Sequence, residues 1–103
     1  MTKLEDEHLN ILRKISKDPN VSQRELAKRI GLSLGKVNYC LNSLKYKGLV
    51  KIRNFKKSEN KTKYLYVLTP KGIAEKTKLT LKFMKRKMEE YDELKEEIKK
   101  LEK

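Results

Sequence analysis

Polar side chains that can bind a base edge recur along residues 33–47 of this 103-residue chain. Apolar residues follow spacings of three and four, which predicts the buried face of an amphipathic helix: Leu34, Val37, Leu41 and Leu44. The opposite face is polar and basic and holds no acid: Gly35, Lys36, Asn38, Tyr39, Asn42 and Ser43. Lysine can donate to guanine O6 and N7, and asparagine can pair with adenine. The residue types therefore favour recognition in a DNA major groove.

We expect six residues of this helix to contact DNA: Ser33, Gly35, Lys36, Asn38, Tyr39 and Asn42. A solvated helix face is the alternative for the polar members of this set. Gly35 lacks a side chain, which could let the backbone approach DNA closely, although a role in packing explains it equally well.

A second short helix must position this one. Ser22 and Glu25 have the spacing of a capping box, and Gly31 is expected to end the helix about nine residues later. The connection through Gly31 into Ser33, the expected N-cap, is short enough for a helix-turn-helix. At its start we expect phosphate contacts from Ser22, Gln23 and Arg24, although Ser22 could serve only as a cap.

The chain before this pair predicts a first helix over residues 4–17. One face of that helix is expected to carry Leu4, His8, Ile11, Leu12 and Ile15. Three acids, Glu5, Asp6 and Glu7, fall in its first turn, where the helix dipole favours negative charge. Asp18-Pro19-Asn20 should end it, because a residue before proline is pushed out of helical geometry.

Two strand-like runs, residues 49–55 and 63–68, follow the helix-turn-helix and flank a polar tip. We expect DNA contacts from the basic residues of this hairpin: Arg53, Lys56, Lys57, Lys61 and Lys63. A solubilising loop, or pairing of Arg53 with Glu59, is the alternative. The predicted fold class is therefore mainly α with a small β-hairpin, a winged helix-turn-helix over residues 1–68.

A long final helix is predicted from Thr69, as N-cap, and Pro70 to the end of the chain. Its apolar residues repeat at spacings near 3.5, which is typical of a coiled coil. We expect them to form a dimer interface over the segment 69–103: Leu81, Met84, Met88, Tyr91, Leu94, Ile98 and Leu101.

The net charge of +13 is concentrated in residues 21–88, which hold 19 basic and 3 acidic side chains. Such a field favours a polyanion, with DNA or RNA first and an anionic membrane surface second. One cysteine and one histidine leave no means of building a disulfide, a metal site or a catalytic triad, so we expect no enzyme, metal or cofactor. Cys40 is expected to be a buried thiol.

The N-terminus is polar and the chain lacks an apolar run of about 20 residues, so neither a signal peptide nor a membrane span is predicted. The expected location is cytoplasmic.

Three runs carry a resemblance to a known family: "LGKVNYCL", "KGLVKIRNF" and "LTPKGI". With the residues around them they resemble the MarR family of winged-helix transcriptional regulators, and more closely its subgroup of EPS-associated regulators. The resemblance implies major-groove contacts by Lys36, Asn38, Tyr39 and Asn42, and wing contacts by Arg53, Lys56, Lys57 and Lys61. Longer members dimerise through helices at both ends and often hold a ligand pocket between those helices and the DNA-binding lobe. Because this chain has one such helix, we predict no small-molecule ligand.

Three functions compete. A homodimeric regulator of double-stranded DNA accounts for the polar helix face, the basic wing and the final helix together. An RNA-binding module also suits the charge, but the deep major groove of A-form RNA excludes a helix. A protein-interaction adaptor would need only the final helix, and it leaves the charge of residues 21–88 unexplained.

Overall fold

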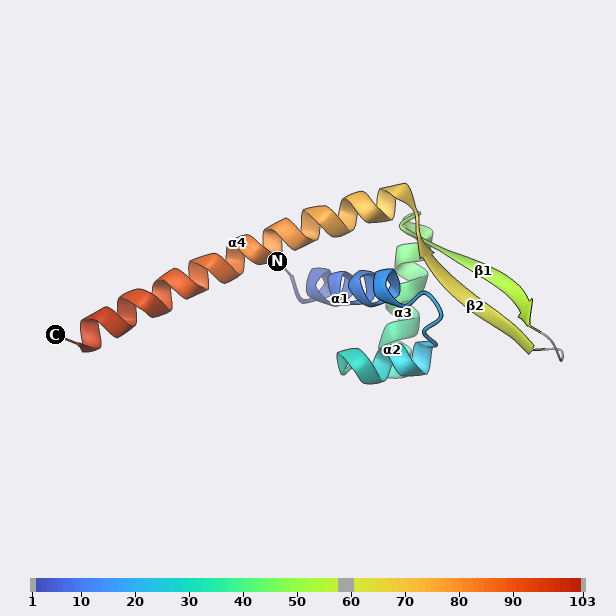
Figure 1. Ribbon diagram of the computed structural model, residues 1–103, viewed down its shortest axis with the longest axis horizontal. Coiled ribbons are helices and arrows are strands. Elements are labelled where there is room, and N and C mark those ends of the chain that lie inside the picture. The colour runs from blue at the N-terminus through green and yellow to red at the C-terminus, as the bar shows by residue number, and fades with distance from the viewer. Residues whose placement is uncertain (1, 58–60, 103) are drawn as a thin grey trace.

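A computed structural model describes residues 2–57 and 61–102, with side chains for 2–53 and 65–102. The chain is mainly helical with one two-stranded hairpin, and its order is α1-α2-α3-β1-β2-α4. The elements are α1 (Lys3–Lys17), α2 (Gln23–Ile30), α3 (Leu34–Tyr46), β1 (Val50–Lys57), β2 (Lys61–Leu68) and α4 (Pro70–Leu101). Helix α1 packs between α4 and the α2–α3 pair (Figure 1). This is the expected winged helix-turn-helix with a long C-terminal helix.

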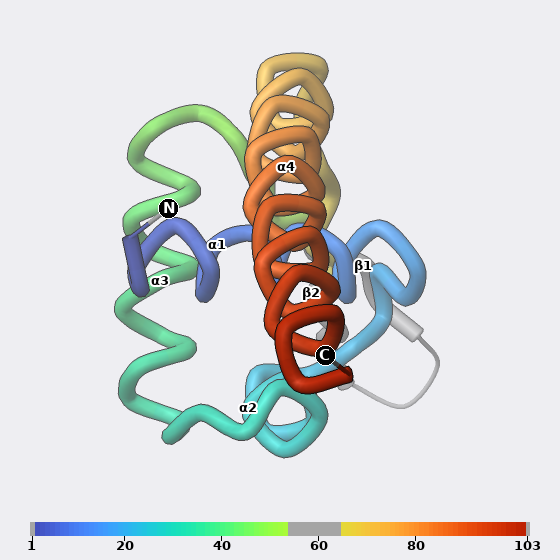
Figure 2. Tube along the Cα trace, turned by 90° about the vertical axis from the view of Figure 1, so that its left-hand side faces the viewer, coloured from blue at the N-terminus to red at the C-terminus, as the bar shows by residue number. Residues whose placement is uncertain are grey.

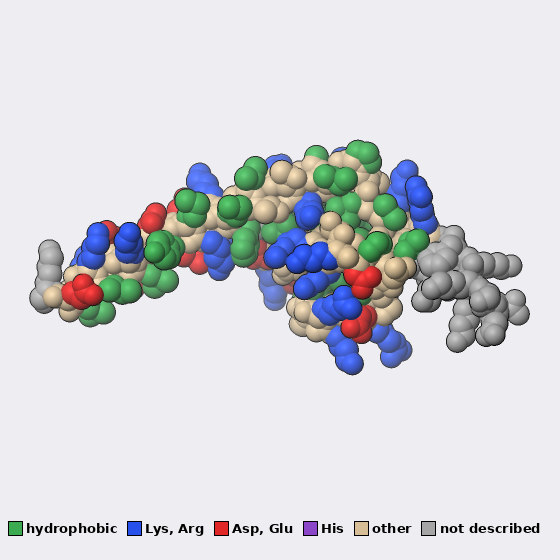
Figure 3. All heavy atoms as spheres, viewed as in Figure 1, with side chains coloured by type: hydrophobic (Ala, Val, Ile, Leu, Met, Phe, Trp, Pro, Cys, Tyr) green, Lys and Arg blue, Asp and Glu red, His purple; other side chains and the backbone are tan. Residues whose placement is uncertain are grey.

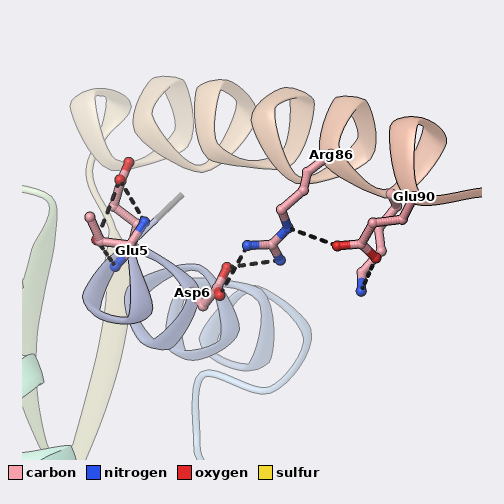
Figure 4. Close-up of polar contacts among 6 residues, drawn as sticks. Glu5, Asp6, Arg86 and Glu90 are labelled. Carbon is pink, nitrogen blue, oxygen red and sulfur yellow. Dashed lines mark hydrogen bonds and ion pairs between the residues drawn. The ribbon is translucent and has the colours of Figure 1, made fainter. Parts of the chain in front are cut away.

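The first turn of α1 departs from its prediction. Thr2 and Glu5 form a capping box, which has the T-x-x-E spacing but was not among the predicted caps. Glu5 and Asp6 face α4, where they pair with Lys82 and Arg86 at 3.3 Å. Figure 4 shows the pair of Asp6 with Arg86. Glu7, which was predicted only to lie in the first turn, has a side chain that is 8% exposed and faces α3. The three acids thus join α1 to two different helices.

The α2–α3 pair follows its local signals closely. Ser22 and Ser33 are N-caps, and each side-chain oxygen accepts from the backbone N–H three residues later. Gly31 and Gly48 take left-handed φ angles of 71° and 74° where α2 and α3 end. One expectation is half met, because the carboxylate of Glu25 accepts from Arg29 instead of returning to Ser22.

The core gathers one face of each helix and the start of the hairpin. Ile11, Leu12, Leu26, Val37 and Leu44 are completely buried. Leu34 was expected in this core, but 40% of it is exposed, because it lies in the first turn of α3 beside Leu32 of the connection. The predicted apolar stripe of α3 therefore starts one turn later than its spacing suggested.

The hairpin is antiparallel, and Val50 pairs with Leu68 at its base and Lys57 with Lys61 near its tip. The tip predicted over residues 56–62 is shorter than expected, because both strands extend into it. Residues 58–60, which include Glu59, lie outside the described part, so the possible Arg53–Glu59 pair is not assessed.

Helix α4 starts as predicted, with Thr69 as N-cap and Pro70 in the first turn. The Thr69 hydroxyl also donates to the carbonyl of Gly48, which joins the start of α4 to the end of α3. Gly72 is buried so tightly that a Cβ there would overlap the carbonyl oxygen of Leu49. These contacts fix the direction in which α4 leaves the domain.

Leu79 is the one buried large side chain of α4, and the helix stays in contact with α1 as far as Arg86. It then projects away from the domain and stretches the molecule to 69 Å (Figure 1). The predicted stripe is exposed along this projection, from 52% at Met84 to 84% at Leu101. Hydrophobic side chains appear along α4 in the space-filling view (Figure 3). No described helix is long and apolar enough to cross a bilayer.

Candidate nucleic-acid interface

The exposed face of α3 lies at the side of the molecule away from the start of α4. Helix α2 and the beginning of α3 occupy this side in both ribbon views (Figures 1 and 2). Gly35, Asn38, Tyr39 and Asn42 are exposed as predicted, and Tyr39 is 61% exposed. Hydrogen-bonding groups of these side chains can therefore reach the edges of base pairs without moving the core.

Three side-chain amides connect α2 to this face. Asn38 Nδ2 donates to Gln23 Oε1 at 3.3 Å, and Asn42 Nδ2 donates to Asn38 Oδ1 at 3.1 Å. Both polar ends of Asn38 thus make a hydrogen bond within the protein. Each bond uses one of the two protons of an amide nitrogen and one of the two lone pairs of an amide oxygen, so Asn38 keeps one donor and one acceptor, and no described bond engages the Asn42 oxygen. The amide chain therefore holds Asn38 and Asn42 in a fixed position relative to α2, and Asn42 has the larger unused hydrogen-bonding capacity.

Gln23, predicted as a phosphate contact, is the α2 end of this amide chain, where its Oε1 atom accepts from Asn38. Ser22 uses its hydroxyl oxygen as a cap, which was its alternative role. Arg24 is exposed beside them. Neither the cap nor the amide bond uses the Ser22 hydroxyl proton or the Gln23 amide protons, so the expected phosphate contacts of all three residues stay predictions.

Lys36 is less free than its sequence position suggested. Its ammonium lies 3.4 Å from the buried Glu7 carboxylate and 5.8 Å from the centre of the Tyr39 ring. The sequence pattern showed no acid near this face. Glu7 nonetheless precedes the buried Ile11 by four residues, and Ile11 precedes Ile15 by four. This helical periodicity could have predicted that Glu7 faces inward.

The wing continues the interface through its backbone. Arg53 is exposed on β1. The side chains of Lys56, Lys57, Lys61 and Lys63 lie outside the described residues, although their backbones belong to the two strands. Their expected contacts with DNA stay predictions.

The single cysteine lies in the core, as predicted. Cys40 is completely buried, and burial followed by the charge of Glu7 raises the pKa of its thiol. Within residues 2–57 and 61–102, no group of three or more His, Cys, Asp or Glu side chains is arranged to hold a metal.

His8 is buried beside a hollow of about 240 Å³ between α1, the end of α3 and α4. Its Nε2 atom is buried without a described hydrogen-bond partner. Burial lowers the pKa of His8, and the charge of Lys47 lowers it further, while Glu7, Glu5 and Glu75 oppose the shift. The fold therefore holds the neutral imidazole.

This burial predicts a loss of stability in mild acid. Because the pKa of His8 is lower in the folded chain, the unfolded chain binds the proton more readily. The stabilisation is complete above the ordinary histidine pKa of about 6.5 and is lost as the pH falls below it. We expect the urea midpoint to drop between pH 7 and pH 5.5, and His8→Gln to abolish most of that drop. An unchanged drop in the variant would contradict this assignment.

Comparisons with known proteins agree with the geometry. Residues 4–51, from α1 to the start of β1, match the family model described as winged helix-turn-helix DNA-binding. The fold and this match define the class: the chain is a winged helix-turn-helix protein. No curated protein matches the chain by sequence.

Solved structures with a similar fold include three bacterial proteins. The PcaV transcriptional regulator of Streptomyces coelicolor, solved with its natural ligand, has a TM-score of 0.67 and 19% identity over 82% of this chain and 57% of its own. Staphylococcus aureus MarR, with salicylate and kanamycin, has a TM-score of 0.62 and 21% identity over 84% and 56%. Streptococcus pneumoniae FabT, in complex with DNA, has a TM-score of 0.61 and 24% identity over 84% and 58%. This chain thus spans little more than half the length of each.

Proposed function

We propose that this protein is a homodimeric, sequence-specific regulator of transcription that binds double-stranded DNA. The observation that carries the proposal is the exposed polar face of α3, with its amide chain held outside the core. In this arrangement α3 enters the major groove and Arg24 contacts the phosphate backbone of the DNA. Arg53, on β1 of the wing, lies towards the adjacent minor groove. A net charge of +13 supplies the attraction to phosphate.

The division of labour follows the predicted domains. Residues 1–68 bind DNA, and residues 69–103 bring two copies together through the exposed apolar stripe of α4. That stripe runs over 20 residues of a projecting helix, which is unusual for a surface that stays in water. Binding to cytoplasmic DNA accords with the predicted location.

Two finer points of the resemblance also stay proposals. Membership of the EPS-associated subgroup is supported only by the sequence runs quoted above. PcaV and S. aureus MarR were solved with small molecules bound. For this chain we propose no small-molecule ligand.

A titration against three nucleic acids tests the proposal. A duplex selected by the protein from a randomised pool, a scrambled duplex and a double-stranded RNA would be compared by fluorescence anisotropy at two salt concentrations. We expect the selected duplex to bind roughly a thousandfold more tightly than the scrambled one. Asn42→Ala should lose about tenfold of this preference and leave scrambled binding unchanged. Equal affinity for all three would refute sequence-specific regulation, and preference for RNA would favour an RNA-binding module.

A further inference from the structure

Of the three acids in the first turn of α1, Glu7 is the one that faces α3. Its side chain is 8% exposed, and both of its described contacts come from α3. The ammonium of Lys36 lies 3.4 Å from Oε2, and the thiol of Cys40 donates to the same oxygen at 3.9 Å. Burial of a carboxylate is costly unless it is paired. Lys36 therefore compensates a charge that the core could not otherwise hold.

The position of Lys36 in α3 strengthens this pairing. It lies in the first turn, where the helix dipole disfavours a positive charge, and that turn contains no acid. Glu7 supplies from α1 the negative charge that α3 lacks at this point. The stem of Lys36 is half-covered, with 42% of the side chain exposed, and the Tyr39 ring borders its ammonium. The aliphatic part of Lys36 is thus partly buried, and its ammonium is held between Glu7 and the Tyr39 ring.

We propose that Glu7 is a positioning residue that makes Lys36 selective, an inference that rests on the proposed function. The ion pair with Glu7 keeps the Lys36 ammonium from binding DNA phosphates. The ammonium then contacts only a base edge that lies at the beginning of α3. A guanine is the base of matching chemistry, since its O6 and N7 accept from lysine. Glu7 thereby lowers affinity for arbitrary duplexes and raises discrimination between sequences.

Glu7→Gln tests this, because it removes the charge and keeps the shape and the acceptor for Cys40. The matched control is Glu5→Gln, which makes the same change of net charge two residues earlier on the same helix. The partner of Glu5 is Lys82 of α4. Both variants would be titrated with the selected duplex and a scrambled duplex over a salt series. We expect Glu7→Gln alone to reduce the selected-to-scrambled ratio by about tenfold. We also expect its scrambled-duplex salt slope to steepen by about one per protomer.

Lys36→Met extends the test from the other side of the pair, because it removes the ammonium and leaves the Glu7 carboxylate without its described cation. Because Lys36 is neutralised before binding, Lys36→Met should lose the same discrimination while leaving the scrambled-duplex salt slope unchanged. Combining Glu7→Gln with Lys36→Met should add no further loss of discrimination.

Two results would overturn the inference. The first is that Glu7→Gln and Glu5→Gln change the selected-to-scrambled ratio and the salt slope alike. The second is that Lys36→Met makes the salt slope for the scrambled duplex shallower by about one per protomer, which is the effect of removing an ordinary phosphate contact. The wild-type ratio judges the proposed function separately. A wild type without preference rejects DNA reading itself, whereas a selective wild type with unaffected variants rejects only the role of Glu7. Thermal unfolding of every variant confirms that each is folded.

Discussion

Gly72→Ala is expected to destabilise the protein by about 3 kcal/mol, near the upper end for an overpacked site. The added Cβ would overlap the backbone oxygen of Leu49, and a backbone group cannot rotate away as a side chain can. Leu49 and Gly72 join the start of the hairpin to the start of α4, so relief requires α4 to move as a whole. The midpoint of thermal unfolding should fall by about 15 °C.

Gly35→Ala provides the matched control, because it makes the same chemical change inside a helix. Nothing lies within 4 Å of a Cβ at Gly35. Alanine should therefore stabilise the fold by about 0.5–1 kcal/mol through its better helix propensity. Circular dichroism melts of both variants measure the difference. A Gly72→Ala protein as stable as the wild type would show that α4 is not seated on Leu49.

Replacement of two stripe residues by polar helix formers, Met88→Gln with Leu94→Gln, is expected to separate the dimer. Both side chains are more than half exposed in the single chain, so the substitutions disturb no core. Glutamine preserves net charge and helix propensity. In sedimentation velocity the wild type should run as a dimer and the double variant as a monomer.

Loss of the dimer should weaken binding to a two-half-site duplex by about a hundredfold or more, because the second half-site no longer benefits from high effective concentration. Affinity for a single half-site should stay the same. Glu89→Gln, at an exposed position of α4 outside the stripe, is the control and should change neither property. A dimer that survives Met88→Gln with Leu94→Gln would place the interface elsewhere, and a monomeric wild type would reject the dimer itself.

The two variants probe opposite ends of one helix. Gly72 anchors α4 to the domain, and the stripe beyond Leu79 extends away from it. Because α4 is continuous between them, the anchoring determines where a second domain would lie relative to the first. Gly72→Ala should therefore also weaken binding to the two-half-site duplex at temperatures where the variant is still folded.

Local signals in the sequence determined the elements. Ser22, Ser33 and Thr69 cap three helices, and Gly31 and Gly48 end two of them in left-handed geometry. A cap needs only neighbours within a few residues, so its chemistry is legible without the fold. The polar face of α3 and the exposed stripe of α4 followed from helical periodicity for the same reason.

Tertiary structure decided which partner each face meets. Periodicity could not show that Glu7 lies against Lys36, since 29 positions separate them and α1 had to dock on α3 first. Nor could it show that the backbone of Leu49 passes over Gly72, or that Leu34 emerges from the core at the beginning of α3. Sequence spacing fixes directions around one helix axis, whereas contacts between elements depend on how the axes cross. The exposed residues of α3 were therefore predictable as a set, and the contacts that Lys36 and Asn38 make within the protein were not.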